Sequence, residues 1–372
     1  MNKIKKYLFS ELYEMSSGIS STKDQADHGA PFLSFSTVFN NYFLPEELKD
    51  KMDTTPKEQE TFSIKKGDIF VTRTSETIDE LAMSCVAMKD YPNATYSGFV
   101  KRLRPKTSEI VDDKFIAFYL RSKLFRKTME NNATMTLRAS FNEDIFSFLS
   151  LYLPPYKEQV RIGKLLYSIE EKIQYNKKIN DNLQHMAYTK YMHMFYGKKS
   201  NGKLGDIIVE QPKSPIQVGE AKEASGTVPF FTSGEAILKW PEALVTGRNC
   251  FLNTGGNADV KFYVGESAYS TDTWCISAKN DMADYLYLLL DSIKLELNLK
   301  FFQGTGLKHL QKPLLRDRSI YIPSGAELRE FNLEVKPWLS MISDNIRESE
   351  ELISLRDWLL PMLMNGQANI QG

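Results

Sequence analysis

The chain of 372 residues is 42% hydrophobic and 25% charged, which is typical of a soluble globular protein with two or three domains. Its 47 Lys and Arg residues balance 47 Asp and Glu residues, so the net charge is zero. This balance argues against a free-standing nucleic-acid binder, which usually carries a basic excess. It fits a subunit whose partners supply part of the positive charge.

The cysteines and the apolar runs bear on the cellular compartment. Cys85, Cys250 and Cys275 are far apart and form no CxxC pair, which argues for a reducing compartment without a disulfide framework or a zinc site. The basic start of the chain is followed by only three apolar residues, too few for a signal peptide. The apolar run at 285–290 is too short to span a bilayer. We therefore expect a cytoplasmic protein.

Strand-like and helical patterns follow one another along the first half. Short β-like stretches at 67–72, 84–88 and 98–103 predict strands. An amphipathic helix is predicted from about 112 to 131, followed by a polar loop and a last strand that ends at two prolines, 154–155. A long helix then begins, because proline is well tolerated at a helix start.

The second half of the chain repeats this order. The segment at 115–122 matches 285–292, and the strand with its proline at 151–155 matches 320–324. Earlier segments also match in the same order, with 8–12 against 204–208, 31–34 against 229–232, and 132–138 against 303–308. Chance similarity would not preserve that order, so the sequence predicts a tandem duplication.

Each half ends in a helix of about 40 residues that is too polar to be stable alone. We therefore expect the two helices to pack on each other as an antiparallel coiled coil. The predicted fold is mixed α+β, with two tandem α/β domains. The predicted boundaries are 1–153 for the first domain, 154–197 for its helix, 198–323 for the second domain and 324–372 for its helix.

The first long helix carries apolar residues with heptad spacing at Ile162, Leu166, Ile169 and Ile173. The same heptad continues through Asn176 and Asn180. Asparagines in a seam weaken packing but fix register and partner. Alternatively, Ile179 takes the core position and both asparagines face water; the spacing does not decide between the two.

Strings that resemble catalytic motifs fail at the residue that carries the chemistry. The LPPY string at 153–156 has Leu153 where amino-methyltransferases need Asp or Asn to accept a hydrogen bond from the target amino group. The string at 197–204 ends in Leu204, where a phosphate loop needs Ser or Thr to reach magnesium. The histidines show no metal-ligand spacing. We therefore expect a non-catalytic chain without a metal site.

Polar and basic residues gather near the predicted strand ends and loops of both domains. Such side chains are the ones that contact base edges and phosphates, although a solvated surface explains any single one as well. The loops differ between the domains more than the apolar framework does, as expected if each domain reads a different target. The candidate DNA-binding residues are Thr72, Arg73, Thr74, Lys101, Arg102, Arg104, Thr136 and Arg138 in the first domain, and Arg248, Asn249, Asn253, Thr254, Thr305, Lys308 and His309 in the second.

The LPPYKEQ motif at 153–159 and the heptad helix after it resemble the specificity subunit of type I restriction–modification systems. The strand at 67–74, GDIFVTRT, also looks like this family's core strand. The second copy has PSGAEL at 323–328 in place of PPYKEQ, so its helix is expected to dock a partner less well. The resemblance places a subunit interface on the first long helix, at Glu158, Gln159, Ile162, Ile169, Ile173, Asn176 and Asn180.

The resemblance implies two target-recognition domains that read a bipartite double-stranded DNA site, with an unread spacer set by the helices. It implies two methylation subunits and a restriction subunit as partners, and these would bind S-adenosylmethionine and ATP with magnesium. Arg138→Ala and Lys308→Ala are then expected each to weaken binding at one half-site only. The alternatives are a stand-alone DNA-modifying enzyme, such as an adenine methyltransferase or a nuclease, and a protein-binding scaffold.

Overall fold

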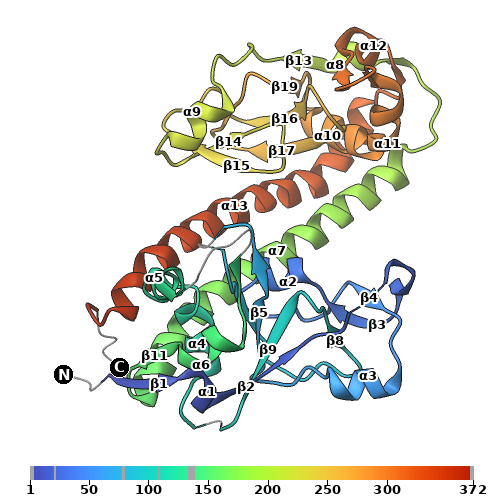
Figure 1. Cartoon of the computed structure of the whole chain (residues 1–372). Coiled ribbons are helices and arrows are strands. Elements are labelled where there is room, and N and C mark those ends of the chain that lie inside the picture. The colour runs from blue at the N-terminus through green and yellow to red at the C-terminus, as the bar shows by residue number, and fades with distance from the viewer. Residues whose placement is uncertain (1–3, 21, 78–79, 108, 133–138, 369–372) are drawn as a thin grey trace. The chain divides into compact units, whose positions relative to one another are not determined.

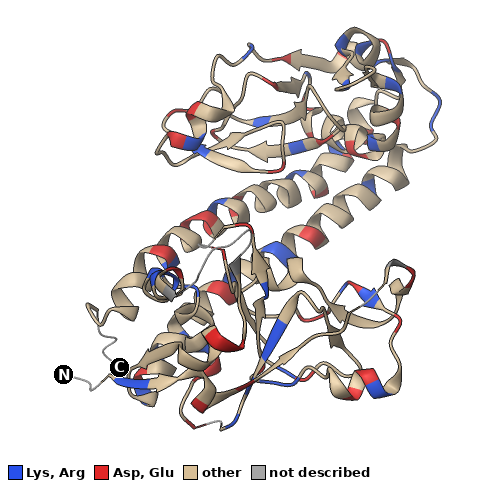
Figure 2. Ribbon diagram, viewed as in Figure 1, with Lys and Arg blue, Asp and Glu red and all other residues tan. Residues whose placement is uncertain are grey.

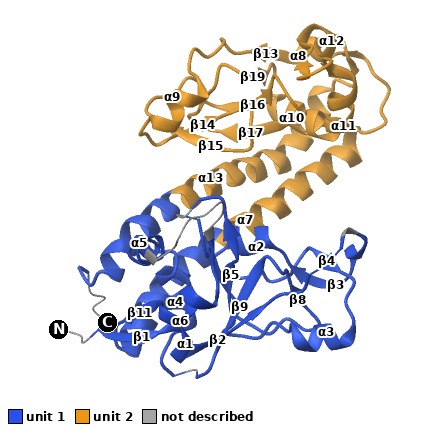
Figure 3. Cartoon of the chain, viewed as in Figure 1, with its two compact units in different colours: residues 1–173, 351–372 blue, residues 174–350 orange. Residues whose placement is uncertain are grey.

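The computed structural model describes residues 4–20, 22–77, 80–107, 109–132 and 139–368. The chain forms two compact units, residues 1–173 with 351–372 and residues 174–350 (Figure 3). Each unit holds one α/β region and a stretch of both long helices. We call the α/β region at 4–153 the first head and the one at 202–322 the second head.

The first head consists of short strands and helices followed by the first long helix (Figure 1). Its strands are β1 (Lys5–Leu8), β2 (Tyr13–Ser17), β3 (Ala26–Leu33), β4 (Lys51–Met52), β5 (Ile69–Thr72), β6 (Thr74–Ser75), β7 (Ser84–Val86), β8 (Thr95–Tyr96), β9 (Val100–Pro105), β10 (Ala139–Ser140) and β11 (Ser150–Leu153). Its helices are α1 (Phe9–Leu12), η1 (Lys23–Gln25), α2 (Phe35–Asn40), α3 (Pro56–Thr61), α4 (Asp113–Tyr119), α5 (Lys123–Asn132) and α6 (Glu143–Phe148), and α7 (Tyr156–Phe195) follows.

The second head is built in the same way and precedes the second long helix. Its strands are β12 (Gly202–Lys203), β13 (Ile208–Glu210), β14 (Val228–Phe231), β15 (Ile237–Trp240), β16 (Arg248–Asn253), β17 (Val260–Val264), β18 (Ala268–Tyr269), β19 (Thr273–Ala278), β20 (Phe302–Gln303), β21 (His309–Leu310) and β22 (Ser319–Ile320). Its helices are α8 (Leu204–Ile207), α9 (Val218–Glu223), α10 (Ala283–Ser292), α11 (Lys294–Glu296), η2 (Leu297–Phe301) and α12 (Lys312–Arg316), and α13 (Gly325–Met364) follows.

The sheet topology repeats between the heads and confirms the duplication. A four-stranded sheet has the order β2-β9-β5-β7 in the first head and β13-β19-β16-β17 in the second. A three-stranded sheet has the order β4-β3-β8 in the first head and β15-β14-β18 in the second. In each head the central strand of this sheet, β3 or β14, pairs in parallel with β8 or β18. The strands β5 and β16 therefore occupy the same place in the two heads.

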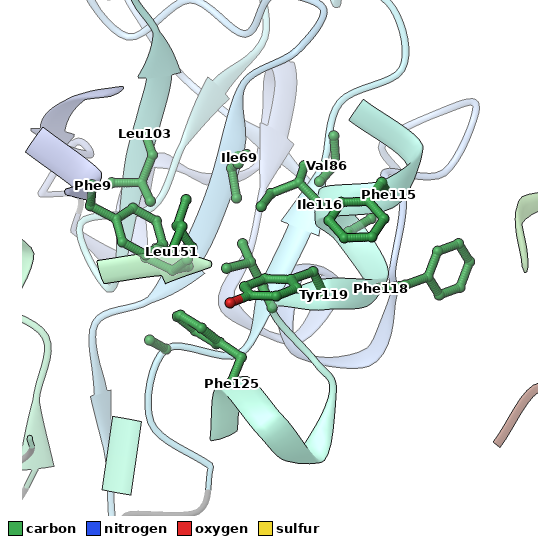
Figure 4. Packing of buried hydrophobic residues seen from close by; sticks show 14 of the residues in the cluster. Phe9, Ile69, Val86, Leu103, Phe115, Ile116, Phe118, Tyr119, Phe125 and Leu151 are labelled. Atoms are coloured by element: carbon green, nitrogen blue, oxygen red, sulfur yellow. The ribbon is translucent and has the colours of Figure 1, made fainter. Parts of the chain in front are cut away.

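The core of the first head follows from the sequence of β5. Ile69 and Val71 point to one side of the sheet, where they pack with Ile116 and the other buried residues of α4 (Figure 4). Phe70 points to the other side and packs with Tyr96 and the three-stranded sheet. Alternate side chains of a strand face opposite sides, so a strand buried on both faces reads as a continuous apolar run.

The helix predicted at 112–131 is two helices. α4 ends at Tyr119 and α5 begins at Lys123. Ser122, between them, donates its hydroxyl to the carbonyl of Tyr119 at 2.6 Å, and its Oγ accepts from the Phe125 N–H at 3.3 Å. A serine at this position favours a new helix start over helix continuation. The apolar spacing that runs through both helices explains the single predicted helix.

The long helices α7 and α13 pack antiparallel, as predicted. In the first unit, Arg356 contacts Glu170, with 2.7 Å between Nη1 and Oε2. In the second unit, Asn176 Nδ2 donates to Glu348 at 2.7 Å, and Lys190 Nζ lies 2.8 Å from Glu334 Oε1. The partner number on α13 falls as the number on α7 rises, which defines the antiparallel direction.

A glycine fixes how closely α7 approaches the first head. A Cβ atom on Gly163 would lie 2.6 Å from the backbone nitrogen of Phe115 and 2.5 Å from the Asp112 carboxylate, closer than real Cβ contacts. Asp112 caps α4 by accepting from the Phe115 N–H at 2.9 Å. The start of α4 therefore rests directly on the backbone of α7, and any larger residue at 163 would push the two apart.

Candidate nucleic-acid interface

In the first head, the segment after β5 lies beside the strand β10. Thr74 and Ser75 in β6 pair with Ser140 and Ala139 in β10, and the Phe141 N–H donates to the Arg73 carbonyl at 2.8 Å. The Arg73 side chain is exposed. The candidates Thr136 and Arg138 lie outside the described residues. The fold therefore brings Arg73 and Thr74 next to Ser140 and Phe141.

In the second head, the corresponding segments also lie side by side. Gly255 bridges to His309, the Gly256 N–H donates to the Lys308 carbonyl at 2.9 Å, and the Leu310 N–H donates to the Thr254 carbonyl at 3.0 Å. Thr305 and His309 are exposed, and Lys308 is half-buried. The turn after β16 and the hairpin loop between β20 and β21 thus form one surface, at the place that β6 and β10 take in the first head.

The asparagine at the end of β16 shapes this surface from within. Asn253 is 5% exposed, and its Nδ2 donates to the carbonyls of Gly255 and Asn257. Its Oδ1 accepts from the Asp259 N–H at 2.7 Å. Thr254 Oγ1 donates to the Asp272 carbonyl at 2.8 Å. All four contacts are internal, so these two side chains hold the turn in shape and leave the exposed loop residues to meet a ligand.

The other polar candidates near β5 and β16 also form hydrogen bonds within the protein. Thr72 is fully buried, and its Oγ1 accepts from the Met83 N–H at 3.0 Å. Asn249 is 1% exposed, and its Nδ2 donates to the Thr246 carbonyl at 3.2 Å. Because both side chains are enclosed and hydrogen-bonded, their burial favours a structural role over direct contact with DNA.

The three basic candidates on β9 point into the first head. Lys101 and Arg102 are 9% exposed; Lys101 Nζ donates to Ser17 Oγ at 2.8 Å, and Arg102 to the Ser63 carbonyl at 2.7 Å. Arg104 makes a two-pronged contact with Asp68 at 2.7 and 2.6 Å. Burial lowers the pKa of Lys101, while the hydrogen bond to Asp68 raises the pKa of Arg104. The alternation of side chains along β9 correctly placed Arg102 and Arg104 on one face of the strand, but that face points into the first head.

Arg248 is held in the same manner in the second head. Its Nε lies 2.8 Å from Asp284 Oδ2 and its Nη2 2.5 Å from Asp284 Oδ1. The same guanidinium donates to Ser340 Oγ at 2.9 Å and to the Lys336 carbonyl at 3.1 Å, both on α13. Burial raises the pKa of Asp284, and the adjacent guanidinium opposes that rise. Arg248 therefore fastens the second head to the long helix.

The residues predicted for a subunit interface at the start of α7 serve the chain's own packing. Gln159 is 1% exposed; its Nε2 donates to the carbonyls of Ile110 and Pro154, and its Oε1 accepts from the Asp112 N–H. Ile162 belongs to the core of the first head. Glu158 and Ile169 are buried and Ile173 is half-buried. A partner docked on α7 would thus contact other side chains.

Asn176 and Asn180 resolve the alternative posed by the heptad pattern. Asn176 is fully buried and donates to Glu348 and to Ser349 Oγ, while Asn180 Oδ1 accepts from Asn345 Nδ2 at 2.8 Å. Ile179 is 41% exposed. Both asparagines therefore lie in the seam with α13. They set its register within the second unit rather than offering a surface to a partner.

Aromatic residues near Thr74 and Ser75 of the first head were not singled out in the sequence. Phe35, Phe39 and Phe99 line a pocket of about 450 Å³ together with Thr74 and Ser75. Phe99 is 65% exposed, in a turn where a large apolar side chain is unexpected. The sequence shows only a phenylalanine directly after Ser97-Gly98; its exposure and its neighbours become visible in the folded chain.

Neither the distribution of charge nor the arrangement of metal-ligand side chains marks a functional site in the part of the chain that the structure describes. Figure 2 shows Lys and Arg interspersed with Asp and Glu through both units. Within the described residues, no group of three or more His, Cys, Asp or Glu side chains is arranged to hold a metal ion. The described helices also include none that is both long and apolar enough to cross a membrane. The feature that the fold repeats is the pairing of Arg73–Ser75 with Ala139–Ser140 in the first head and of Thr254–Gly256 with Lys308–His309 in the second.

Comparison with known proteins identifies the class. Residues 5–185 match the family described as type I restriction modification DNA specificity domain. The crystal structure of a type I restriction–modification S subunit from M. genitalium is similar over 97% of this chain and 96% of that chain, with a TM-score of 0.62 and 16% sequence identity. The HsdS subunit from Thermoanaerobacter tengcongensis aligns over 98% and 97% of the two chains, with a TM-score of 0.36 and 14% identity.

Residues 5–185 are therefore a DNA specificity domain, and the whole chain has the fold of a type I S subunit. This domain is the feature by which the chain is classed with type I restriction–modification proteins.

Proposed function

We propose that each head of this specificity subunit reads one half of a bipartite double-stranded DNA target. The observation that carries the proposal is the repeated pairing of two loops: Arg73–Ser75 beside Ala139–Ser140, and Thr254–Gly256 beside Lys308–His309. Each pair lies at the end of the equivalent central strand, β5 or β16. Arg73 and His309 are exposed there and Lys308 is half-buried, and side chains of these types suit base edges and phosphates.

The partners in this proposal are two methylation subunits and the restriction subunits of the same system. S-adenosylmethionine and ATP with magnesium would bind to those partners. Since the seam residues of α7 and α13 are enclosed, docking would use the exposed apolar side chains of the helices. In the first unit these are Tyr156, Val160, Ile353, Leu355 and Trp358, and in the second unit Tyr175, Ile179, Met186, Leu333 and Met341. A cytoplasmic location remains a prediction from the sequence.

The first experiment is to co-purify the chain with the methylation subunit of its source and to sequence the methylome of cells that express both. A single bipartite motif, methylated only when this chain is present, is the expected result. A stable complex without a new methylated motif would contradict the reading of DNA by this chain. Failure to form a complex would contradict the proposed partners and favour a scaffold.

The assignment of one half-site to each head is tested with Arg73→Ala and Lys308→Ala. Each variant should weaken binding by about 1–3 kcal/mol, because each removes one charged contact to DNA. Each should lose discrimination at one half-site only, and the two variants should affect different half-sites. Binding of the purified complex to duplexes altered in one half-site at a time gives the measurement, with each variant as the control for the other. Equal loss at both half-sites would contradict the assignment.

A further inference from the structure

The aromatic pocket of the first head is built before any ligand arrives. The Phe35 and Phe39 rings stack with centroids 5.9 Å apart. Arg121 Nη2 donates to the carbonyls of Val38 and Phe39, each at 2.8 Å, and so fixes the end of α2. The Phe99 carbonyl accepts from the Arg73 N–H at 2.8 Å, which fixes the backbone of the turn that carries the third ring. The fold therefore fixes the backbone on which the three rings stand.

The pocket belongs to the proposed DNA-reading surface. Thr74 and Ser75, which line it, form the strand that pairs with β10, and Arg73 directly precedes them. Glu76 and Glu80 also line the pocket. Carboxylates repel phosphates but accept hydrogen bonds from the exocyclic amino groups of bases. Their charge therefore favours contact with base edges in a groove over contact with the phosphate backbone.

The apolar group that DNA presents to such a surface is the C5-methyl of thymine in the major groove. A phenyl ring that is 65% exposed without DNA loses water when a methyl group covers it. Thymine also pairs with adenine, whose N6 amino group lies in the same groove and suits the carboxylates at the pocket.

From this arrangement we infer that the first head uses Phe99, with Phe35 and Phe39, to recognise the methyl group of a thymine in its half-site. This specificity determinant rests on the proposed function. In the second head Asp272 stands where the first has Phe99, because its carbonyl accepts from the Thr254 N–H at 3.1 Å as the Phe99 carbonyl accepts from the Arg73 N–H. The second head is therefore not expected to share the preference. The pocket would thus account for one difference in sequence preference between the heads.

The test uses the complex with the methylation subunit and duplexes in which each thymine of the target is replaced, one at a time, by deoxyuridine. Deoxyuridine pairs identically but lacks the C5-methyl. One replacement, in the half-site that Arg73→Ala affects, should weaken binding about 4-fold, the value expected for one buried CH₂ group. Phe99→Ala should bind the thymine and deoxyuridine duplexes equally. Phe148→Ala, which removes a phenyl ring that is 47% exposed on α6, should keep the thymine preference.

Several outcomes would overturn the inference. These are a wild-type complex that ignores every deoxyuridine replacement, a Phe99→Ala complex that still prefers thymine, and a sensitive thymine in the half-site affected by Lys308→Ala. A rise in 2-aminopurine fluorescence that depends on Phe99 would show instead that the pocket takes an unstacked base. If the wild-type complex binds no duplex selectively, the proposed function itself fails, and that result is distinct from all of these.

Discussion

The arginines of the two heads divide into those that stabilise the fold and those available to a ligand. Arg104 and Arg248 each grip an aspartate that is fully buried, while Arg73 is exposed at the end of β5. All three lie in or beside a strand, and the residue type alone does not separate them. What separates them is the carboxylate opposite, which comes from a distant part of the chain.

Arg248→Ala is therefore expected to destabilise the second unit. Removing one partner of a buried ion pair leaves Asp284 uncompensated and costs about 3–5 kcal/mol of unfolding free energy. Urea unfolding measures this loss. Arg329→Ala, which removes an exposed arginine from α13, should change the unfolding free energy by less than about 0.5 kcal/mol. A stable Arg248→Ala chain that has lost DNA binding would contradict the structural role and return Arg248 to the interface.

At the scale of elements, the start of α13 shows that a different sequence can still cap a long helix. The PSGAEL string lacks the second proline of the first copy, yet Ser324 and Glu327 form a capping box. The Ser324 N–H donates to Glu327 Oε2 at 2.8 Å, and the Glu327 N–H donates to Ser324 Oγ at 3.4 Å. The S-x-x-E spacing of such a box is readable in the sequence. The structure therefore shows a different helix start rather than a degraded one.

The same glutamate gives a pH dependence. Contacts with Lys198, Ser324 and Tyr321 lower the pKa of Glu327 to about 2, below its ordinary value of 4.5. Its ionised form thus stabilises the fold fully above pH 4.5, and this stabilisation is lost as the pH falls towards 2. Glu327→Gln keeps a capping side chain but loses the ion pair, so it should lower the thermal midpoint at pH 6 and less so at pH 3.

A pH series of thermal unfolding curves checks this expectation. Glu330→Gln, a substitution on the exposed side of the same helix, serves as the matched control and should follow the wild type at every pH. A difference between wild type and Glu327→Gln that stays constant from pH 6 to pH 3 would show that the carboxylate charge does not stabilise the start of the helix.

At the scale of the whole molecule, sequence order and packing diverge. The first unit is completed by residues 351–372. Leu360, Leu363 and Met364 of α13 lie in the same buried cluster as Phe115 and Leu151 of the first head. The last described helix therefore belongs in part to the core of the first head, more than 200 residues earlier in the chain.

Leu360→Ala should consequently loosen the first head and spare the second. Truncating a buried leucine costs about 2–5 kcal/mol. Hydrogen exchange should quicken in α4 and β11 while β16 and β19 keep their protection. Leu355→Ala, on the same helix but 43% exposed, should leave both heads unchanged. Faster exchange in the second head alone would refute the placement of this leucine in the first core.

The patterns that predicted most were the long periodic ones. The helix α7 begins and ends within two residues of the predicted bounds 154–197, and α13 begins within one residue of the predicted 324 but ends at Met364, before the predicted 372. The repeated order of elements was visible in matched segments such as 115–122 and 285–292, which overlap the helices α4 and α10. The interior faces of β9 and the ring pocket at Phe99 were not visible, because Ser63, Asp68 and Arg73 meet them only after folding.

The discontinuous first unit has a consequence for synthesis. A ribosome that has made residues 1–173 must still translate residues 174–350 before Leu360 exists to close the first core. At 5–20 residues per second this interval is roughly 10–35 s. Throughout it, the nascent first head exposes the apolar side chains that α13 will cover. A prematurely released chain therefore lacks a finished first head, and the cell receives either the complete fold or an unstable fragment open to proteolysis.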